Sequence, residues 1–373
     1  MYPLLTIDHE KIAANVRQMV AYCGQYGIEI TGITKVVCGD PEIAKIYIDN
    51  GISRIGDSRV ANLKKLAWLP CEKWLIRMPM CSEAEDVVRW ADVSLNSELD
   101  TLKALARACR ALRKTHKVVL MYDLGDIREG FLSMDDIRAA ADYARQTPEL
   151  ELYGVGTNLT CFSFIQPDTE KLTLLTQVAE EIHATPCISG GNSATLDLMF
   201  RGGIPKEVNL LRLGESLLFG RERAKYRYLD GTYNDAFRLQ AEIIELKEKP
   251  SLPWGTVGVD SYGNSPTFTD RGVRMKAICA LGKQDIDVET MWPIDEGIHI
   301  LGASSDHLML DVEDSELDYR VGDTIEFRLG YFALMRAYTS SYVTKLHLNR
   351  QAESISVPFS EEELSRAVSA AAV

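Results

Sequence analysis

A lysine stands at the end of a strongly apolar segment near the start of the chain, Gly32–Val37 (GITKVV). Charged side chains are almost never fully buried without a partner, so a lysine at this place is unusual. Burial or a neighbouring cation lowers the pKa of a lysine and produces the nucleophilic amine that Schiff-base chemistry requires. Lys35 is therefore a candidate nucleophile. The structural alternative is a lysine that simply extends from a strand end into solvent.

A glycine-rich segment, Ser189–Thr195 (SGGNSAT), is a candidate anion site. Its two glycines let the backbone N–H groups approach a ligand, and Ser193 and Thr195 add hydroxyl donors. The segment opens a predicted helix, whose N-terminus favours negative charge. The pattern favours a phosphate group, and a capped helix after a glycine turn is the structural alternative.

An arginine occupies the end of a later apolar segment, Leu210–Glu215 (LLRLGE). Arg212 can only donate hydrogen bonds, and it stays charged at neutral pH. Gly220, a few residues further on, could add a backbone donor for the same anion. The alternative role for the arginine is a surface ion pair with Glu215 or Glu222.

A regular fold must position these residues. From about residue 10 to 215, the chain has one repeating pattern of predicted secondary structure. Short β-branched segments alternate with longer amphipathic segments at intervals of roughly 20 to 30 residues. The predicted strands are Ile28–Val37, Ser53–Gly56, Lys73–Arg77, Ala91–Asn96, Lys117–Asp123, Leu152–Asn158, Thr185–Ser189 and Val208–Arg212. The predicted helices between them include Pro41–Asn50, Ser97–Arg113, Met134–Arg145 and Asp168–His183.

Eight alternations are typical of a (β/α)8 TIM barrel, in which the active site lies at the carboxyl ends of the strands. In barrels, the loops after the seventh and eighth strands are the usual phosphate site, and these are the loops that hold Ser193 and Arg212. A doubly wound open sheet is the alternative. It usually has fewer strands, and no G-x-G-x-x-G follows the first strand here.

The pattern changes after Arg223 to short runs with period-two alternation, which indicate antiparallel strands. The runs are Gln240–Leu246, Gly272–Ala280, His299–Leu301, His307–Asp311 and Thr324–Leu329. We therefore expect an α/β chain with a (β/α)8 barrel at 10–222, followed by a mainly antiparallel C-terminal β domain at 223–373 that includes residues 1–9. The tract Gly220–Tyr233 is expected to connect the two.

The composition narrows the possible partners and location. The chain has 373 residues, with 41 Lys and Arg against 54 Asp and Glu, so its net charge is −13. This balance argues against binding nucleic acid through its phosphates. No apolar run has the ~18 residues that a membrane span needs, and the start lacks a secretion signal, so we expect a cytoplasmic protein. Eight cysteines without CxxC spacing and six widely spaced histidines predict neither disulfides nor a metal site.

The order of the three features is more specific than any of them alone. A lysine after strand one, a phosphate segment after strand seven and an arginine after strand eight resemble the alanine racemase family of barrel-type pyridoxal 5′-phosphate enzymes. Within this family, the chain is most similar to the ornithine/lysine racemase-like branch. The resemblance implies that Lys35 forms the Schiff base with the cofactor, that Asn192 and Ser193 belong to its phosphate site, and that Arg212 faces its pyridine nitrogen. We expect Gly191, Gly214 and Gly220 to contact the cofactor as well.

The resemblance also implies roles for residues that the composition does not single out. Arg128, in Tyr122–Gly130 (YDLGDIREG), corresponds to the arginine that binds the cofactor phenolate and the substrate carboxylate. Asn158 stands where the family usually has a histidine under the cofactor ring. Ser305 and Asp306 fall in the substrate-binding segment, and Asp306 is a candidate partner for a distal ammonium. Tyr262 is similar to the second catalytic base, which the partner subunit supplies, so the resemblance implies a homodimer with shared active sites.

The arginine decides between reaction types within this fold. A carboxylate at the pyridine nitrogen would keep the ring protonated and suit decarboxylation, whereas an arginine favours the unprotonated ring. We therefore expect a two-base racemase that exchanges the α-proton of a small-molecule amino acid, either a basic one (ornithine or lysine) or alanine. The alternatives are a non-catalytic pyridoxal-phosphate-binding protein of vitamin homeostasis and a decarboxylase of the same fold.

Overall fold

The computed structural model of the chain describes residues 1–259, 263, 265 and 267–349. Eight parallel strands, β2 to β9, close into a barrel in the order of the sequence, with β9 pairing back to β2. This confirms the predicted (β/α)8 barrel. The strands are β2 (Glu29–Ile33), β3 (Arg54–Asp57), β4 (Glu72–Leu75), β5 (Val93–Asn96), β6 (His116–Met121), β7 (Leu150–Gly156), β8 (Cys187–Ser189) and β9 (Leu210–Leu213).

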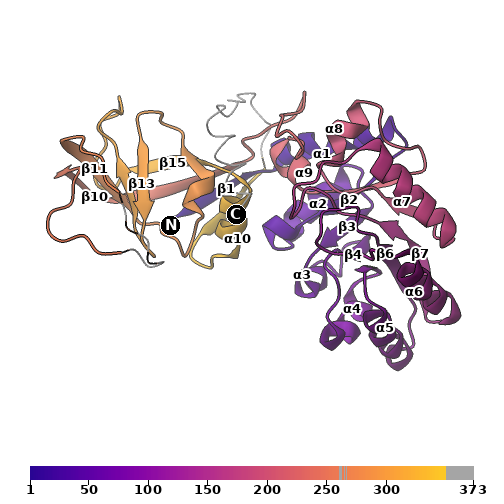
Figure 1. Ribbon diagram of the computed structural model, residues 1–373. Coiled ribbons are helices and arrows are strands. Elements are labelled where there is room, and N and C mark those ends of the chain that lie inside the picture. The colour runs from indigo at the N-terminus through magenta and orange to yellow at the C-terminus, as the bar shows by residue number, and fades with distance from the viewer. Residues whose placement is uncertain (260–262, 264, 266, 350–373) are drawn as a thin grey trace.

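Helices cover the outside of the barrel and connect its strands (Figure 1). They are amphipathic, as crossover helices must be: α5, for example, buries Leu102, Leu105 and Cys109 against the sheet. The helices are α1 (His9–Gly24), α2 (Pro41–Asp49), α3 (Val60–Lys65), α4 (Ala84–Trp90), α5 (Leu99–Leu112), α6 (Met134–Gln146), α7 (Thr169–Glu181), α8 (Thr195–Phe200) and α9 (Glu215–Phe219), with short 3₁₀ turns η1 (Lys35–Val37) and η2 (Cys81–Glu83).

The first barrel strand is shorter than the predicted Ile28–Val37. It ends at Ile33, and Lys35 begins a 3₁₀ turn that finishes in two residues of left-handed backbone, Cys38 (φ 51°) and Gly39 (φ 63°). The turn is fixed from outside the segment, because Thr34 donates its hydroxyl to Asp57 Oδ2 at 2.8 Å. The predicted start of the next helix is confirmed, since Asp40 caps α2 and Pro41 is its first residue.

The C-terminal part is a mainly antiparallel sheet, as predicted. Its order is β12-β15-β10-β11-β14-β13, and β1 pairs antiparallel with β10 and parallel with β16. The strands are β1 (Leu4–Asp8), β10 (Phe237–Pro250), β11 (Val273–Cys279), β12 (Met291–Pro293), β13 (His299–Ala303), β14 (Leu308–Asp311), β15 (Thr324–Leu329) and β16 (Thr344–Leu348), with a 3₁₀ turn η3 at Val288–Thr290. Helix α10 (Tyr331–Thr339) follows β15 and was not expected from the alternating pattern.

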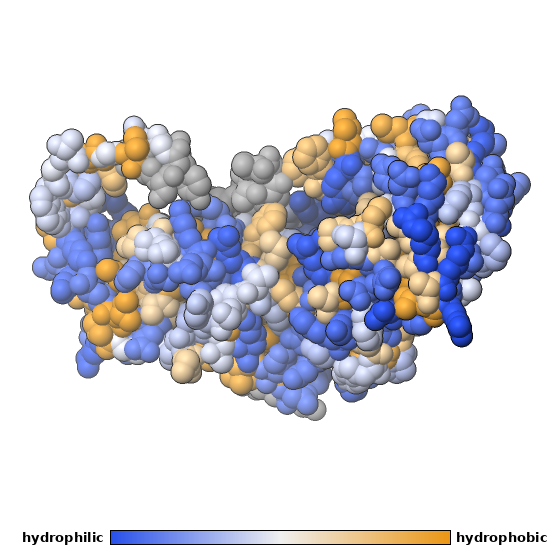
Figure 2. All heavy atoms as spheres, turned by 90° about the horizontal axis from the view of Figure 1, so that it is seen from below, coloured by the Kyte–Doolittle hydropathy of each residue, from blue (hydrophilic) through white to orange (hydrophobic). Residues whose placement is uncertain are grey.

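The barrel and the sheet form two lobes that lie side by side (Figure 1) and share one hydrophobic core. The cluster runs from Ile43 of α2 through Leu5 of β1 to Phe237 of β10 and Leu334 of α10, all of which are buried. On the face shown in Figure 2, hydrophobic residues are interspersed among hydrophilic ones over both lobes. No helix within the described residues has the length and apolar character needed to cross a membrane.

Candidate active site

A cavity of ≈ 570 Å³ opens at the carboxyl ends of the barrel strands. This is the end of the barrel at which the predicted site residues were expected to meet. Those that line it are Lys35, Arg128, Asn158, Asn192, Ser193, Arg212 and Gly214. Residues at or just beyond the ends of β2, β6, β7, β8 and β9 thus converge on one cavity.

Lys35 lines the cavity from the turn η1, where solvent reaches its side chain although protein atoms surround the amine. Its amine lies 5.7 Å from the centre of the Tyr331 ring, which belongs to α10. Tyr331 raises the pKa of the Lys35 amine above its ordinary value and outweighs burial, which lowers it. The expectation of a lowered pKa is therefore not met in this structure. Tyr331, from the other lobe, therefore favours the ammonium form of Lys35.

The glycine-rich segment forms a tight turn before α8. Gly191 has a φ of +113°, and a Cβ at this position would lie 2.8 Å from Thr195 Oγ1, so only glycine fits without strain. Ser193 Oγ lies 3.2 Å from Ser216 Oγ at the start of α9, which brings the loops after β8 and β9 together. Asn192 holds the turn itself, since its side chain donates to Leu159 O at 3.0 Å.

Arg212 is the most deeply buried cation that lines the cavity. Only 4% of its surface is exposed, and it donates to Ser189 Oγ, to Thr157 O at 2.5 Å and to Asn158 Oδ1 at 2.6 Å. Burial lowers the pKa of its guanidinium to about 10, which still leaves it charged at neutral pH. The surface-ion-pair alternative for Arg212 is wrong.

The two acidic residues considered for that alternative have other partners. Glu215 pairs with the buried Arg221, whose Nη2 lies 2.6 Å from Glu215 Oε1. Glu222 accepts the backbone N–H groups of Ala224 and Lys225, at 2.6 and 3.0 Å. Both carboxylates therefore organise the segment after α9. Neither pairs with Arg212, whose guanidinium lines the cavity.

A chain of hydrogen bonds crosses the cavity from Arg212 to Arg128. Asn158 accepts from Arg212 and donates to Glu129, and Glu129 in turn accepts two hydrogen bonds from Arg128, one of them at 2.6 Å. The turn that carries Arg128 is shaped by Asp123, whose Oδ1 accepts the N–H groups of Gly125 and Ile127. Glu129 thus orients both Asn158 and Arg128.

Sequence reasoning missed several residues of this cavity. Glu129 lies beside Arg128 in a segment that was already singled out, so proximity could have suggested it. Tyr331 and Phe332 come from α10 and reach the cavity because this helix packs on η1. No local signal points to them, since the contact joins segments about 300 residues apart. Arg223 and Tyr226 also line the cavity, and the guanidinium of Arg223 lies 4.6 Å from the Tyr226 ring centre.

Other predicted residues are not brought to this cavity within one chain. Gly220 ends α9 with a φ of +61°, and a Cβ there would lie 2.3 Å from Thr232 Oγ1, so it serves packing of the chain after α9. Ser305 and Asp306 lie on the β13–β14 hairpin, where Gln284 donates to Asp306 Oδ1 at 2.7 Å. Tyr262 lies outside the described residues. Gly191 does not line the cavity either, but its positive φ forms the turn that precedes Asn192 and Ser193, which do.

Comparisons with known proteins agree with this geometry. The family model for the N-terminal domain of alanine racemase matches residues 7–222. An ornithine racemase from Acetoanaerobium sticklandii is 44% identical over 350 residues, which cover 92% of this chain and 99% of that protein. A lysine racemase from Thermotoga maritima is 38% identical over 354 residues, covering 93% of this chain and 99% of the relative.

This chain belongs to the alanine racemase family. Solved structures of other members share its fold at low sequence identity. Alanine racemase from Bacillus anthracis with bound L-Ala-P has a TM-score of 0.70 and 17% identity, over 94% of this chain and 95% of that one. Alanine racemase from Bartonella henselae with covalently bound pyridoxal phosphate has a TM-score of 0.69 and 15% identity, over 92% of this chain and 99% of that one.

Proposed function

We propose that this chain is a pyridoxal 5′-phosphate-dependent racemase that interconverts the L and D enantiomers of a basic amino acid, ornithine or lysine. Membership of the family gives the reaction class and the cofactor. One observation carries the proposal: a single cavity holds an amine, Lys35, and a buried guanidinium, Arg212, in a chain 44% identical to an ornithine racemase.

The residues present fit this cofactor. Its aldehyde could react with the amine of Lys35. Its phosphate could be bound by Asn192 and Ser193, which line the same cavity after the turn at Gly191. Ser193 Oγ accepts the backbone N–H of Ser216 at 3.3 Å, so the start of α9 holds this hydroxyl in place. When bound, pyridoxal 5′-phosphate accepts the electron pair that is left when the α-proton departs from the substrate.

Arg212 suits racemisation because its guanidinium does not transfer a proton to the cofactor ring. Its guanidinium, with a pKa of about 10, can donate a hydrogen bond to a ring nitrogen without giving up the proton. Its contacts with Ser189, Thr157 and Asn158 hold it in place. The ring nitrogen would therefore face a fixed positive charge, and not a carboxylate that keeps the ring protonated. The α-carbon is then reprotonated in preference to the loss of carbon dioxide.

Proton exchange on two faces needs two bases. We assign one face to Lys35, whose amine lies in the cavity beside Tyr331. We assign the other face to Tyr262 of the partner subunit, on the basis of its resemblance to the family's tyrosine. We assign Arg128, which lines the cavity and donates to Glu129, to the α-carboxylate, which it would bind through charge-assisted hydrogen bonds.

The preference for a basic side chain rests on the two relatives, which are named for ornithine and lysine. Because Ser305 and Asp306 do not line the cavity of their own chain, we propose that the hairpin of one protomer contributes them to its partner's site. A carboxylate such as Asp306 would pair with the distal ammonium of the substrate. This requires the homodimer that Tyr262 also requires.

The test is a panel of L-amino acids with the wild-type protein and a Lys35→Ala variant. We expect wild type to racemise ornithine or lysine faster than alanine. The variant should lose turnover by at least ~10²-fold and lose the covalent cofactor absorbance. Lys45→Ala, on the exposed face of α2, is the control and should retain both.

Two kinds of outcome would overturn the proposal. Racemisation that persists in Lys35→Ala would exclude the amine as base and cofactor ligand. Activity on alanine alone would exclude a basic substrate, and carbon dioxide release in place of enantiomer exchange would make the chain a decarboxylase.

A further inference from the structure

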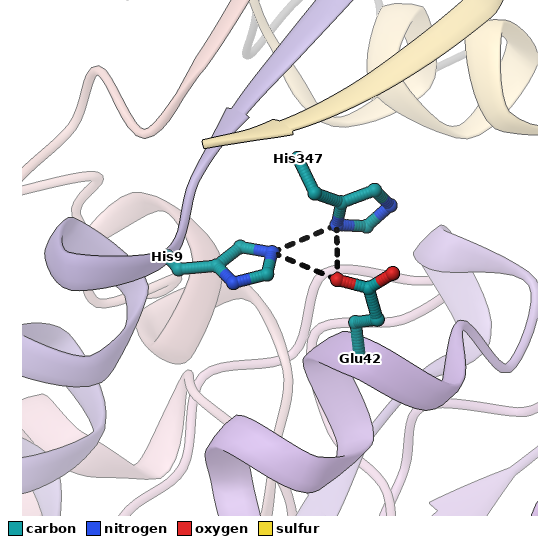
Figure 3. A group of neighbouring side chains, drawn as sticks. All are labelled: His9, Glu42 and His347. Atoms are coloured by element: carbon teal, nitrogen blue, oxygen red, sulfur yellow. Dashed lines mark hydrogen bonds and ion pairs between the residues drawn. The ribbon is translucent and has the colours of Figure 1, made fainter. Parts of the chain in front are cut away.

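Three potential metal ligands meet at the junction of the two lobes, away from the lining of the cavity. They are His9 at the start of α1, Glu42 in the first turn of α2 and His347 in β16 (Figure 3). The six histidines are widely spaced in the sequence, and no metal site was expected from them. Pairing of β1 with β16 places Ile7 beside His347, and so brings residues 9 and 347 together.

The ligand atoms already have spacings close to those of a metal site. His9 Nε2 lies 2.8 Å from His347 Nδ1, and each of these nitrogens lies 3.6 Å from Glu42 Oε2. In a tetrahedral site with bonds of about 2.0–2.2 Å, neighbouring ligand atoms are about 3.3–3.6 Å apart. Only the distance between the two nitrogens must increase, by about 0.5 Å on the same geometry. The imidazole rings meet edge to face at 73°, with these two nitrogens at hydrogen-bond distance from each other.

A second layer of hydrogen bonds selects the nitrogen that His347 offers. Its Nε2 lies 3.3 Å from Asp40 Oδ2, which also accepts the hydroxyl of Tyr338 at 3.2 Å. Metal-bound histidines generally donate their other ring N–H to a carboxylate in this way, which fixes the tautomer. Asp40 itself is held as the cap of α2, so the orienting group is part of a rigid element.

Access and charge also suit a cation. The side chains of His9 and His347 are 13% and 20% exposed, whereas that of Glu42 is 60% exposed, so the cluster opens to solvent on one side. That side can admit a water molecule as a fourth ligand. Asp8, Asp40 and Glu42 are the carboxylates that act on His9, and they supply negative charge around the site.

We propose that His9, Glu42 and His347 bind a divalent transition-metal ion, for which Zn²⁺ fits best, with water completing a tetrahedral shell. Mixed imidazole and carboxylate ligands favour Zn²⁺ over Mg²⁺ or Ca²⁺, which prefer oxygen ligands. In the metal-free protein, His9 Nε2 and His347 Nδ1 share one proton in a hydrogen bond. On binding, that proton moves to Nδ1 of His9, and both nitrogens give their lone pairs to the metal.

Such an ion would connect segments that are distant in the sequence. Glu42 lies on α2, directly after the turn that carries Lys35, and His347 lies in the last strand of the sheet. Metal binding at this junction would hold the lysine turn and the second lobe in one arrangement. The role is structural, and it is independent of the racemase chemistry proposed above.

The experiment uses the full-length holoenzyme, stripped of metal with a chelator and then equilibrated with Zn²⁺ at stoichiometric concentration. We expect one Zn²⁺ per chain by elemental analysis and a rise in melting temperature on adding Zn²⁺. Co²⁺ should give the intense visible bands of a tetrahedral site. Glu42→Gln, His9→Asn and His347→Asn should lose the bound metal, and Asp40→Asn, which keeps the helix cap, should bind ~10–100-fold more weakly.

His183→Asn is the matched control, because His183 is exposed at the end of α7 and asparagine tolerates its positive φ of 48°. It should bind Zn²⁺ like wild type. Glu42 is largely exposed, so Glu42→Gln should fold normally and isolates the ligand effect. Absence of stoichiometric metal in wild type, or equal binding by wild type and Glu42→Gln, would overturn the proposal. Metal content and melting temperature are measured without a racemase assay, so a failure of the proposed function would leave this test intact.

Discussion

At the scale of single residues, Arg212 shows how burial and hydrogen bonds define a chemical role. A guanidinium offers five donors in a planar arrangement, and here three acceptors from two neighbouring strand ends engage it. An ammonium at the same place would be a point charge without that geometry. We therefore expect the site to depend on the shape of the cation as well as on its charge.

Arg212→Lys is expected to reduce racemase kcat by about 10²-fold, because misplacement of a group by about 1 Å costs this much. Lysine keeps the charge but cannot reach Ser189, Thr157 and Asn158 at once. Steady-state kinetics with L-ornithine measures the change, and circular dichroism verifies the fold. Arg201→Lys, at the exposed end of α8, is the control. Wild-type kcat in Arg212→Lys would show that charge alone suffices.

At the scale of elements, the strands carry buried polar groups as well as apolar ones. His116 begins β6 and is 2% exposed, and its Nε2 lies 2.9 Å from Ser94 Oγ of β5. Burial lowers the pKa of His116 to about 4. The imidazole is therefore neutral in the folded barrel over a pH range in which it would be charged in the unfolded chain.

This shift predicts acid destabilisation with a definite sign. In the unfolded chain His116 binds a proton below about pH 6.5, whereas in the folded chain it does so only below about pH 4. The free energy of unfolding therefore falls as the pH decreases from 6.5 to 4. The loss is at most about 3 kcal/mol. Melting temperatures measured from pH 7 to pH 4 should fall less steeply in His116→Gln than in wild type. Parallel curves for the two proteins would contradict the assignment.

How far the sequence predicts the structure depends on whether a feature is local. The alternation of strands and helices is local, and it led to the barrel, to the antiparallel sheet and to the cap of α2. Predicted strands extended too far at their carboxyl ends, where Lys35 and Asn158 lie just beyond β2 and β7. Those ends are set by contacts with other segments, such as the bond from Thr34 to Asp57.

The candidate site was predictable to the same degree. Motifs after the strands pointed to Lys35, Ser193 and Arg212, and the barrel brings all three to one cavity. Tyr331 was not predictable, because α10 reaches η1 only through packing of the second lobe. The domain boundaries and the individual roles of the site residues stay predictions, as does the contribution of Tyr262, which lies outside the described residues.

At the scale of the whole molecule, a shared hydrophobic core joins the two lobes. Leu5, Ile43, Phe237 and Leu334 belong to a single buried cluster. The proposed catalytic site goes further and combines two molecules, with Lys35 from one protomer and Tyr262 of the partner subunit. Such an arrangement makes each site depend on both subunits of a two-fold dimer.

Subunit mixing tests that arrangement. Lys35→Ala and Tyr262→Phe homodimers should each be nearly inactive. After the two are unfolded and refolded together, half of the dimers are mixed and each holds one intact site, so roughly a quarter of wild-type activity should return. Light scattering should show a dimer for each variant before unfolding and for the refolded mixture. No recovery in a mixture that demonstrably exchanges subunits would place both bases on the same chain.

The placement of β1 has a consequence for biosynthesis. Leu4 faces Gln240 on one side and Thr344 on the other. Ribosomes extend a chain at about 5–20 residues per second, so β1 emerges well before either neighbour has been translated. Throughout that interval both of its edges are open, and β1 strands of adjacent nascent chains on a polysome can pair with each other. Pairing of this kind would compete with native sheet closure.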